Sequence, residues 1–294
     1  MIIKAPAKIN LYLEIINKRE DGYHNIESVM HTVSLFDTLE FLPSDTIELF
    51  CNDKNLPVDK TNLVYKTAVK FKEKYNITKG IKINLTKNIP MGAGLGGGSS
   101  DAAATISALN KFWKINANKK DLEIFAATIG ADVPFFLTGG TAKISGIGNI
   151  VDKIPCKNNY FFVLVKPNFG VSTVHAYSKI KFPLTNPRKI NKITEVFKNS
   201  FFSKEDFRDL VFNRFEEFVF DEYPEILKIK NVLQNLGCVS LMSGSGATVF
   251  GLMSNQEELN YVFDKLKQYN WNIWAASSFE VYNNSAFGGT VRWQ

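Results

Sequence analysis

The sequence predicts a mixed α/β protein of two domains, and three observations support this prediction. Runs in which apolar and polar residues alternate, typical of strands, occur between runs whose apolar residues recur at helical spacing. The length of 294 residues corresponds to one large or two medium domains. The character of the sequence changes after residue 150. We therefore expect a boundary near residue 155, giving domains of residues 1–155 and 156–294.

The first half contains the clearest elements. Ile9–Ile15 alternates strictly and ends at a turn signal over residues 19–22. Further extended segments are predicted at about 28–50 and at 81–85. Helices are predicted over 62–75, 101–112 and 121–129, and Gly130 suits a C-terminal cap for the last of them.

The second half is less regular, and residues 180–205 show no clear period. Strands are expected at 160–165, 239–241, 247–253 and 271–281. Helices are expected at 207–220, 226–236 and 257–269. The alternation of both element types supports the mixed class.

Composition excludes several classes of protein. With 45% hydrophobic and 22% charged residues, the chain is neither disordered nor fibrous. The net charge of +6 is spread along the chain, which favours solvated surfaces over a field that attracts anionic ligands such as nucleotides. No dense basic stripe with interleaved aromatic residues is present, so we expect no nucleic acid partner.

Cysteine usage and hydropathy also limit the possibilities. Cys51, Cys156 and Cys238 are far apart and form no CxxC pair, so neither a disulfide framework nor a zinc site is predicted. A reducing cytoplasm fits this pattern. Residues 231–256 lack charge but are rich in glycine, serine and asparagine, which makes a membrane span a poor interpretation.

The strongest local signal is a glycine-rich segment between a predicted strand and a predicted helix. Five glycines fall within residues 92–98, and two serines follow. Glycine lets a ligand approach the backbone closely, and a helix N-terminus favours an anion. We therefore predict a phosphate-binding loop, the alternative being a flexible turn. It comprises Pro90, Met91, Gly92, Ala93, Gly94, Leu95, Gly96, Gly97, Gly98, Ser99 and Ser100. It is not a Walker A loop, because no lysine follows the glycines.

Three segments together resemble the GHMP kinases, the family of galactokinase, homoserine kinase, mevalonate kinase and phosphomevalonate kinase. These segments are KAPAKIN at 4–10, PMGAGLGGGSSDAAA at 90–104 and LMSGSGAT at 241–248. The DGYH sequence at 21–24, the triple glycine of the loop and GADVPFF at 130–136 are similar to one branch of the family. Members of that branch phosphorylate 4-diphosphocytidyl-2-C-methyl-D-erythritol. The resemblance covers nearly the whole chain.

The resemblance implies a ribosomal-protein-S5-like N-terminal domain and a ferredoxin-like C-terminal domain, with the active site in the cleft between them. It implies transfer of the γ-phosphoryl group of ATP, accompanied by Mg²⁺, to the 2-hydroxyl group of the cytidyl substrate. The step belongs to non-mevalonate isoprenoid biosynthesis, which suggests a bacterial cytoplasmic protein or a plastid protein without its transit peptide. We expect a monomer or a homodimer. The alternatives are another GHMP kinase of homoserine or mevalonate type, and a non-catalytic RNA-binding protein.

Two residues match the catalytic positions of the family. Asp132 lies among apolar neighbours, and taken alone it could be a turn or cap aspartate. Lys8 lies in an apolar strand, and taken alone it could be an edge lysine whose ammonium reaches solvent. The resemblance implies that Asp132 takes the proton of the substrate hydroxyl group and that Lys8 is its partner.

The resemblance also places binding residues. Near ATP it implies Asn62 and Lys87, for which a helix cap and an exposed lysine are the alternatives. Mg²⁺ is expected at Ser99, Ser100 or Asp101. The residues implied for the substrate are Asn10, Tyr23, His24, Tyr177, Ser243 and Gly244. From the residues alone, His24 could be a solvated loop histidine and 243–246 a simple hairpin turn. Asn149 departs from the branch, which often has glutamate there.

Overall fold

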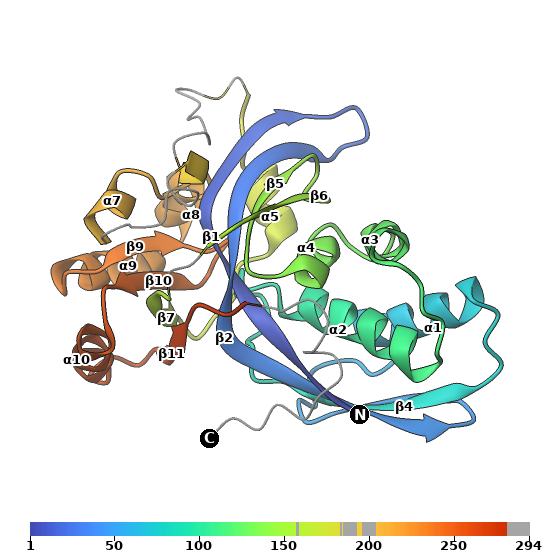
Figure 1. Ribbon diagram of the computed structural model, residues 1–294. Coiled ribbons are helices and arrows are strands. Elements are labelled where there is room, and N and C mark those ends of the chain that lie inside the picture. The colour runs from blue at the N-terminus through green and yellow to red at the C-terminus, as the bar shows by residue number, and fades with distance from the viewer. Residues whose placement is uncertain (157–158, 183, 185–192, 196–203, 281–294) are drawn as a thin grey trace.

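Two β-sheets form the framework of the computed structural model, which describes residues 1–156, 159–182, 184, 193–195 and 204–280 (Figure 1). Among these residues, the larger sheet has seven strands and the smaller has four. The larger sheet runs in the order β3 (Ile47–Cys51), β4 (Gly80–Thr86), β2 (His24–Ser44), β1 (Ile2–Lys18) and β8 (Phe212–Asn213). Next to β2 lies β5 (Thr141–Ser145), followed by β6 (Ile150–Ile154).

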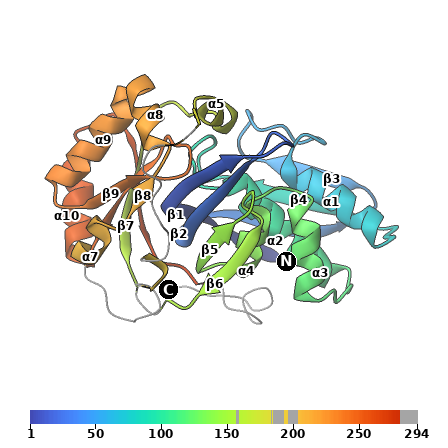
Figure 2. The same ribbon diagram turned by 90° about the horizontal axis from the view of Figure 1, so that it is seen from above.

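The smaller sheet belongs to the second half of the chain. Its order is β11 (Asn272–Ser277), β7 (Phe161–Lys166), β10 (Val249–Met253) and β9 (Val239–Met242), with every neighbouring pair antiparallel. Figure 2 shows α8 (Glu216–Glu222), α9 (Pro224–Asn235) and α10 (Gln256–Leu266) on its outer side. The apolar residues of α9 pack there with Val163 and Val165 of β7. Two shorter helices of this half are α5 (Thr173–Ser178) and α7 (Lys204–Arg208).

Four helices cover the larger sheet. They are α1 (Leu63–Lys74), α2 (Gly97–Phe112), α3 (Lys119–Ala127) and α4 (Val133–Thr138). The apolar side of α1, including Phe71, shares one core with Phe41 of β2 and Ile83 of β4. The alanine-rich middle of α2 is buried in the same core, because its small side chains let the helix approach the sheet closely.

The central strand β1 is buried on both of its faces. Its alternation predicts one apolar and one polar face, yet Asn10, Tyr12 and Glu14 are as buried as Ile9 and Leu11. The reason is that elements of both halves of the chain pack against β1, and the strand contributes to all three apolar clusters. A buried polar face in the middle of a molecule needs hydrogen-bonding partners, and these partners build the site described below.

Among the described residues, two β-pairings link the two halves of the chain. The short strand β8 pairs in parallel with Tyr12 and Leu13 of β1. After β11 the chain returns to β2, where Ser278 forms a bridge with Val33. The predicted domain boundary at residue 155 falls between β6 and β7, and it stays a prediction.

The predicted elements are largely found, with three corrections. The predicted helix over 207–220 is wrong, because its middle forms β8, a pairing with β1 that local periodicity does not encode. Helix α2 begins at Gly97 and not at residue 101. The strand predicted for 271–281 ends at Ser277, and residue 281 lies outside the described residues, as does most of 180–205.

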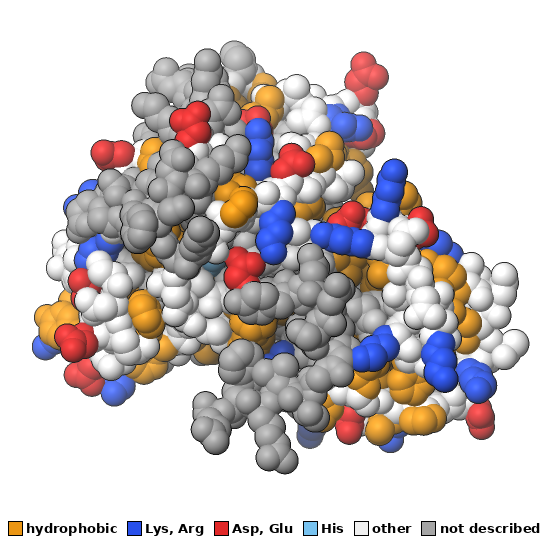
Figure 3. Space-filling view, in the orientation of Figure 1, with side chains coloured by type: hydrophobic (Ala, Val, Ile, Leu, Met, Phe, Trp, Pro, Cys, Tyr) orange, Lys and Arg blue, Asp and Glu red, His pale blue; other side chains and the backbone are white. Residues whose placement is uncertain are grey.

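Surface charge is mixed on the face shown in Figure 3, where Lys and Arg side chains lie scattered among Asp and Glu. The Lys and Arg side chains form no continuous stripe on this face. In the described part of the chain, we find no helix with the length and apolar character that crossing a membrane demands.

Candidate active site

A cleft of about 460 Å³ lies between the glycine-rich loop, the middle of β1, the start of α4 and the turn between β9 and β10. It is lined by most of the predicted site residues: Lys8, Asn10, Asn62, Lys87, Pro90, Met91, Gly92, Ala93, Gly94, Leu95, Gly96, Gly97, Gly98, Ser99, Asp101, Asp132, Tyr177 and Gly244. The predicted residues that do not line it are Tyr23, His24, Ser100 and Ser243. The cleft therefore collects residues from both halves of the chain.

The glycine-rich loop ends at the N-terminus of α2. Gly92, Gly94 and Gly96 have φ values of 59°, 72° and 70°, a left-handed backbone that favours glycine. Gly96 occupies the N-cap position and supplies no side-chain cap, so the first N–H groups of this 16-residue helix have no intrahelical partner. Because Gly97, Gly98 and Ser99 line the cleft, this helix start is suited to binding a phosphate anion there.

Residues of β1 and of the turn between β9 and β10 hold the loop through its carbonyl groups. Lys8 N–H donates to the Leu95 carbonyl at 3.0 Å, and Thr248 N–H donates to the Ala93 carbonyl at 3.3 Å. The Ser243 hydroxyl group donates to the Gly94 carbonyl at 2.9 Å. The outward-facing carbonyls are thereby satisfied, and the loop is fixed to both halves of the chain.

Lys8 and Asp132 lie in the same cleft. Lys8 is buried, and its ammonium donates to Asn10 Oδ1, while Asn10 Nδ2 donates to Ser28 Oγ at 2.8 Å. Burial lowers the pKa of Lys8, and the charge of Asp132 opposes this shift. The predicted partnership of Lys8 and Asp132 is thus an electrostatic attraction, because the hydrogen bond of Lys8 goes to Asn10.

Asp132 is half-buried at the N-terminus of α4, and its side chain forms no capping bond with that helix. Gly148 approaches it closely, since a Cβ atom on Gly148 would lie 3.6 Å from Asp132 Oδ1. A carboxylate held at a helix start, in a cleft that also holds a lysine, can accept a proton from a bound hydroxyl group.

Aromatic rings form one wall beside the cleft. The rings of His24 and Tyr177 stack with centroids 4.9 Å apart, and Phe182 stacks on His24 at 5.9 Å. Burial and the nearby charge of Asp132 raise the pKa of Tyr177, and burial lowers the pKa of His24. Such flat faces suit a heterocyclic base. Tyr23 is 60% exposed and lies outside this stack.

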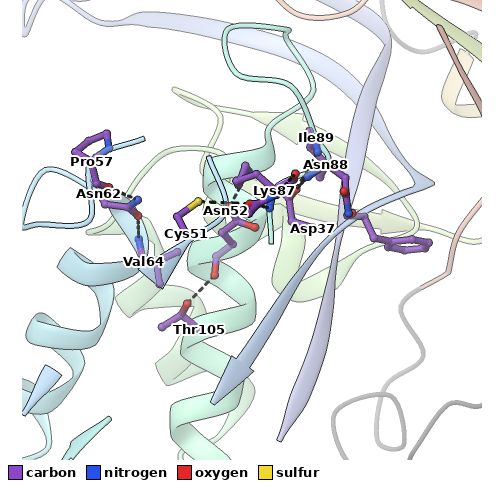
Figure 4. A network of polar contacts seen from close by, with 12 residues as sticks. Asp37, Cys51, Asn52, Pro57, Asn62, Val64, Lys87, Asn88, Ile89 and Thr105 are labelled. Carbon is purple, nitrogen blue, oxygen red and sulfur yellow. Dashed lines mark hydrogen bonds and ion pairs between the residues drawn. The ribbon is translucent and has the colours of Figure 1, made fainter. Parts of the chain in front are cut away.

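Asn62 is a helix cap in this structure. Its Oδ1 accepts from Val64 N–H at 2.9 Å, and its Nδ2 donates to the Pro57 carbonyl at 2.8 Å (Figure 4). Asn62 is nevertheless at the cleft, so the capping role and a position beside a nucleotide are compatible.

Lys87 is not the exposed lysine of the alternative interpretation. Its side chain is 7% exposed and forms ion pairs with Asp37 and Asp101. Burial raises the pKa of Asp101 to about 8, and the charge of Asp37 adds to the shift. Burial lowers the pKa of Lys87, but the two carboxylates outweigh this effect and the net shift is upward.

The residues expected to reach Mg²⁺ fit that role unequally. Ser99 lines the cleft, whereas the Ser100 hydroxyl group is buried and has no partner. One oxygen of Asp101 accepts from Lys87, and the other is buried without a partner. Within the described ranges, no three His, Cys, Asp or Glu side chains are grouped so as to hold a metal ion. A magnesium ion here would depend on phosphate oxygens for most of its ligands.

Sequence reasoning missed two buried polar residues of the site. Asp37 lies within an apolar strand, and such a carboxylate was itself a signal that went unused. Asn213 donates to the carbonyls of Met242 and Gly244 at 2.6 and 2.7 Å, and so fixes the turn over the loop. Asn213 gave no signal, because it lies inside the segment wrongly predicted as a helix.

The sequence also matches known proteins. Residues 62–140 match the GHMP kinases N terminal domain, and residues 198–272 match the GHMP kinases C terminal family. A 4-diphosphocytidyl-2-C-methyl-D-erythritol kinase of Bacillus cereus (strain B4264) is 38% identical over 281 residues, covering 94% of this chain and 96% of the relative. The chain belongs to the 4-diphosphocytidyl-2-C-methyl-D-erythritol kinase family. A Bacillus mycoides (strain KBAB4) member has the same identity and coverage.

Solved structures support the assignment of the chain to this family. A crystal structure of 4-(cytidine 5'-diphospho)-2C-methyl-D-erythritol kinase superposes with a TM-score of 0.79 and 31% identity, covering 94% of this chain and 98% of that one. Mevalonate kinase of Methanococcus jannaschii has a TM-score of 0.73 at 19% identity, covering 95% and 98%, and shares the fold. The predicted family and its two-domain fold are confirmed, and use of ATP follows from membership of the GHMP kinases.

Proposed function

We propose that this protein transfers the γ-phosphoryl group of ATP to the 2-hydroxyl group of 4-diphosphocytidyl-2-C-methyl-D-erythritol. The products are the 2-phosphate and ADP, in the non-mevalonate route to isoprenoid precursors. The observation that carries the proposal is the meeting, in one cleft, of an open helix N-terminus with Asp132 and Lys8. Near full-length similarity to kinases that bear this substrate in their names supports the choice of acceptor.

The nucleotide lies on the α2 side of the cleft in this proposal. The N–H groups of residues 92–99 hold the phosphates, while Asn62 and Lys87 flank the adenosine. Mg²⁺ accompanies ATP near Ser99, Ser100 or Asp101, with Ser99 in the best position because it lines the cleft, whereas the Asp101 carboxylate is paired with Lys87. When bound, the ion neutralises charge on the phosphate oxygens.

Asp132 takes the proton of the acceptor hydroxyl group while the oxygen of that hydroxyl group forms a bond to the γ-phosphorus. The bond from that phosphorus to the β,γ-bridging oxygen breaks, and its electron pair leaves with ADP. The Lys8 ammonium interacts electrostatically with Asp132, and Asn10 holds this ammonium in place. These residues contribute orientation and charge, which are the main requirements of phosphoryl transfer.

The cytidine end of the substrate lies toward the aromatic wall. We assign His24 and Tyr177 to contacts with the base, because the Tyr177 ring lines the cleft and the His24 ring stacks on Tyr177. Tyr23 is close in sequence and reaches the base if its exposed ring turns inward. Gly244 faces the substrate, and Ser243 acts from behind by holding the turn against the loop.

The remaining assignments concern the protein as a whole. We propose domains of residues 1–155 and 156–294, with the catalytic cleft between them, in a monomer or homodimer. The Bacillus relatives support a bacterial source, and three widely spaced cysteines without a CxxC pair fit a reducing cytoplasm.

ADP release tests the reaction. The purified protein is given ATP and Mg²⁺ with the cytidyl substrate, homoserine or mevalonate, and Asp132→Asn is the control. We expect turnover with the cytidyl compound alone and loss of turnover in the control. Turnover with another alcohol would retain the phosphoryl transfer and overturn the assignment of His24 and Tyr177 to a base. Equal turnover in the Asp132→Asn variant would remove the proton-accepting role.

A further inference from the structure

Three buried charged side chains from three separate segments meet behind the glycine-rich loop. Asp37 comes from β2, Lys87 from the residue after β4, and Asp101 from the second turn of α2 (Figure 4). Their side chains are 0%, 7% and 3% exposed. The Lys87 ammonium donates to Asp37 Oδ2 and, at 2.8 Å, to Asp101 Oδ2. One lysine therefore bridges two carboxylates in a place that water barely reaches.

The other oxygen of Asp37 holds the chain where it enters the loop. Asp37 Oδ1 accepts from Asn88 N–H at 2.6 Å and from Ile89 N–H at 2.8 Å, and these residues directly precede Pro90. Asn52 fixes the same segment from its other side, because its amide bonds both the N–H and the carbonyl of Lys87. Asp37 thus contacts the entry of the loop directly.

Asp37 reaches the exit of the loop through Lys87. The Lys87 ammonium pairs with Asp101 on α2, and it would lie 3.1 Å from a Cβ atom on Gly97, the first residue of that helix. We propose that Asp37 is a positioning residue for the nucleotide, which fixes the two ends of the glycine-rich loop relative to each other through its bonds to residues 88–89 and to Lys87. This inference rests on the proposed binding of ATP phosphates by the loop.

The charges of the cluster are consistent with this role. A buried lysine is costly unless it is paired, and here both partners are within hydrogen-bonding distance. These pairings hold the three segments together, because each buried charge keeps its partner only in this arrangement.

Asp37→Asn distinguishes the contact of Asp37 with residues 88–89 from its contact with Lys87. The new amide oxygen must keep facing the two N–H groups of residues 88 and 89, so its NH₂ group faces the Lys87 ammonium, donor against donor. The entry contact is retained and the bridge to α2 is lost. The matched control is Glu14→Gln, because Glu14 is also fully buried and pairs with Arg214 through bonds of 2.7 Å, away from the loop.

Calorimetric titration tests the inference. It measures the Kd of the protein for the β,γ-imido analogue of ATP in the presence of Mg²⁺ and without the acceptor alcohol. Loss of a charge-assisted hydrogen bond in the support of the loop should raise the Kd of Asp37→Asn about tenfold. Glu14→Gln should change the Kd less than about twofold while lowering the Tm. In steady-state kinetics of Asp37→Asn, the KM for ATP should rise more than kcat falls, with the KM for the cytidyl substrate unchanged.

A double-mutant cycle distinguishes positioning from general destabilisation. If Asp37 acts through Lys87, then Asp37→Asn has no further effect on the Kd in a Lys87→Met background. Equal Kd values for Asp37→Asn and the wild type, or fully additive effects in the cycle, would overturn the inference while leaving the proposed function intact. Failure of the wild type to bind the analogue would overturn the proposed function and the inference with it.

Discussion

The Ser243 hydroxyl group donates a hydrogen bond to the Gly94 carbonyl at 2.9 Å, across 149 positions of sequence. The same two residues approach so closely that a Cβ atom on Gly94 would lie 2.0 Å from the Ser243 carbonyl oxygen. The glycine-rich loop and the turn between β9 and β10 are therefore one packed unit. Glycine at position 94 is required by this contact as well as by its φ of 72°.

Gly94→Ala tests this contact, with Gly22→Ala as its control. Both glycines have positive φ values, 72° and 85°, but nothing lies within 4 Å of a Cβ atom on Gly22. Gly22→Ala should therefore lose about 1–2 kcal/mol of stability and keep its activity. Gly94→Ala must also move the loop away from Ser243, and we expect kcat/KM for ATP to fall about 100-fold. Equal kinetics in the two variants would contradict the packing argument.

Asp132→Asn should separate chemistry from binding. The amide cannot take a proton from the acceptor hydroxyl group, so kcat should fall roughly 10²–10⁴-fold. ATP binding should be nearly unchanged, because the loop and α2 are held by contacts that do not involve Asp132. Rapid-quench measurement of phosphoryl transfer and calorimetry with the ATP analogue give the two quantities. A large loss of ATP affinity with normal transfer would reverse the assigned role.

A buried histidine makes stability depend on pH. His31 contacts Thr141 Oγ1 at 2.8 Å and Ser278 Oγ at 2.9 Å, and burial lowers its pKa from 6.5 to about 4. The folded protein resists protonation of His31, whereas the unfolded chain accepts the proton readily. The contribution of neutral His31 to the free energy of unfolding is therefore fully present above pH 6.5 and is lost as the pH falls toward 4. Between pH 7 and pH 4.5 this loss amounts to about 2–3 kcal/mol.

Urea unfolding of the wild type and of His31→Gln at both pH values checks this prediction. Other groups also titrate in this range, so the informative quantity is the difference between the two proteins. The free energy of unfolding should fall less steeply with acid in the variant, since glutamine has no proton to gain. Parallel pH dependence in the two proteins would show that His31 is not the responsible group.

The sequence indicated those parts of the site that are determined by residues close together in the chain. The glycines of 92–98 and the cap at Asn62 are visible because spacing and residue type determine them. The ion pairs of Lys87 were not visible, because Asp37 lies 50 positions away and reaches it through the pairing of β2 with β4. The helix predicted for 207–220 failed for the same reason, since β8 exists through its contact with β1. Long-range pairing overrides local pattern in these places.

The wrongly predicted segment provides a last test, at Asn213. Its Nδ2 donates to the carbonyls of Met242 and Gly244, and its Oδ1 accepts from Phe215 N–H at 3.0 Å. Asn213→Asp keeps the shape but places an oxygen against two carbonyl oxygens in a buried site. The turn that holds the glycine-rich loop should move, so we expect a lower Tm and a rise of about tenfold in the KM for ATP.

The control for this variant is Asn255→Asp. Asn255 caps α10 by accepting from Glu258 N–H at 2.9 Å, and aspartate caps a helix equally well. We therefore expect the Tm and the KM for ATP of this control to stay close to those of the wild type. Thermal unfolding and steady-state kinetics at varied ATP compare the two variants. If Asn213→Asp lowers the Tm but leaves the KM for ATP unchanged, the turn holds the fold together without positioning the loop, and the link between Asn213 and nucleotide binding is wrong.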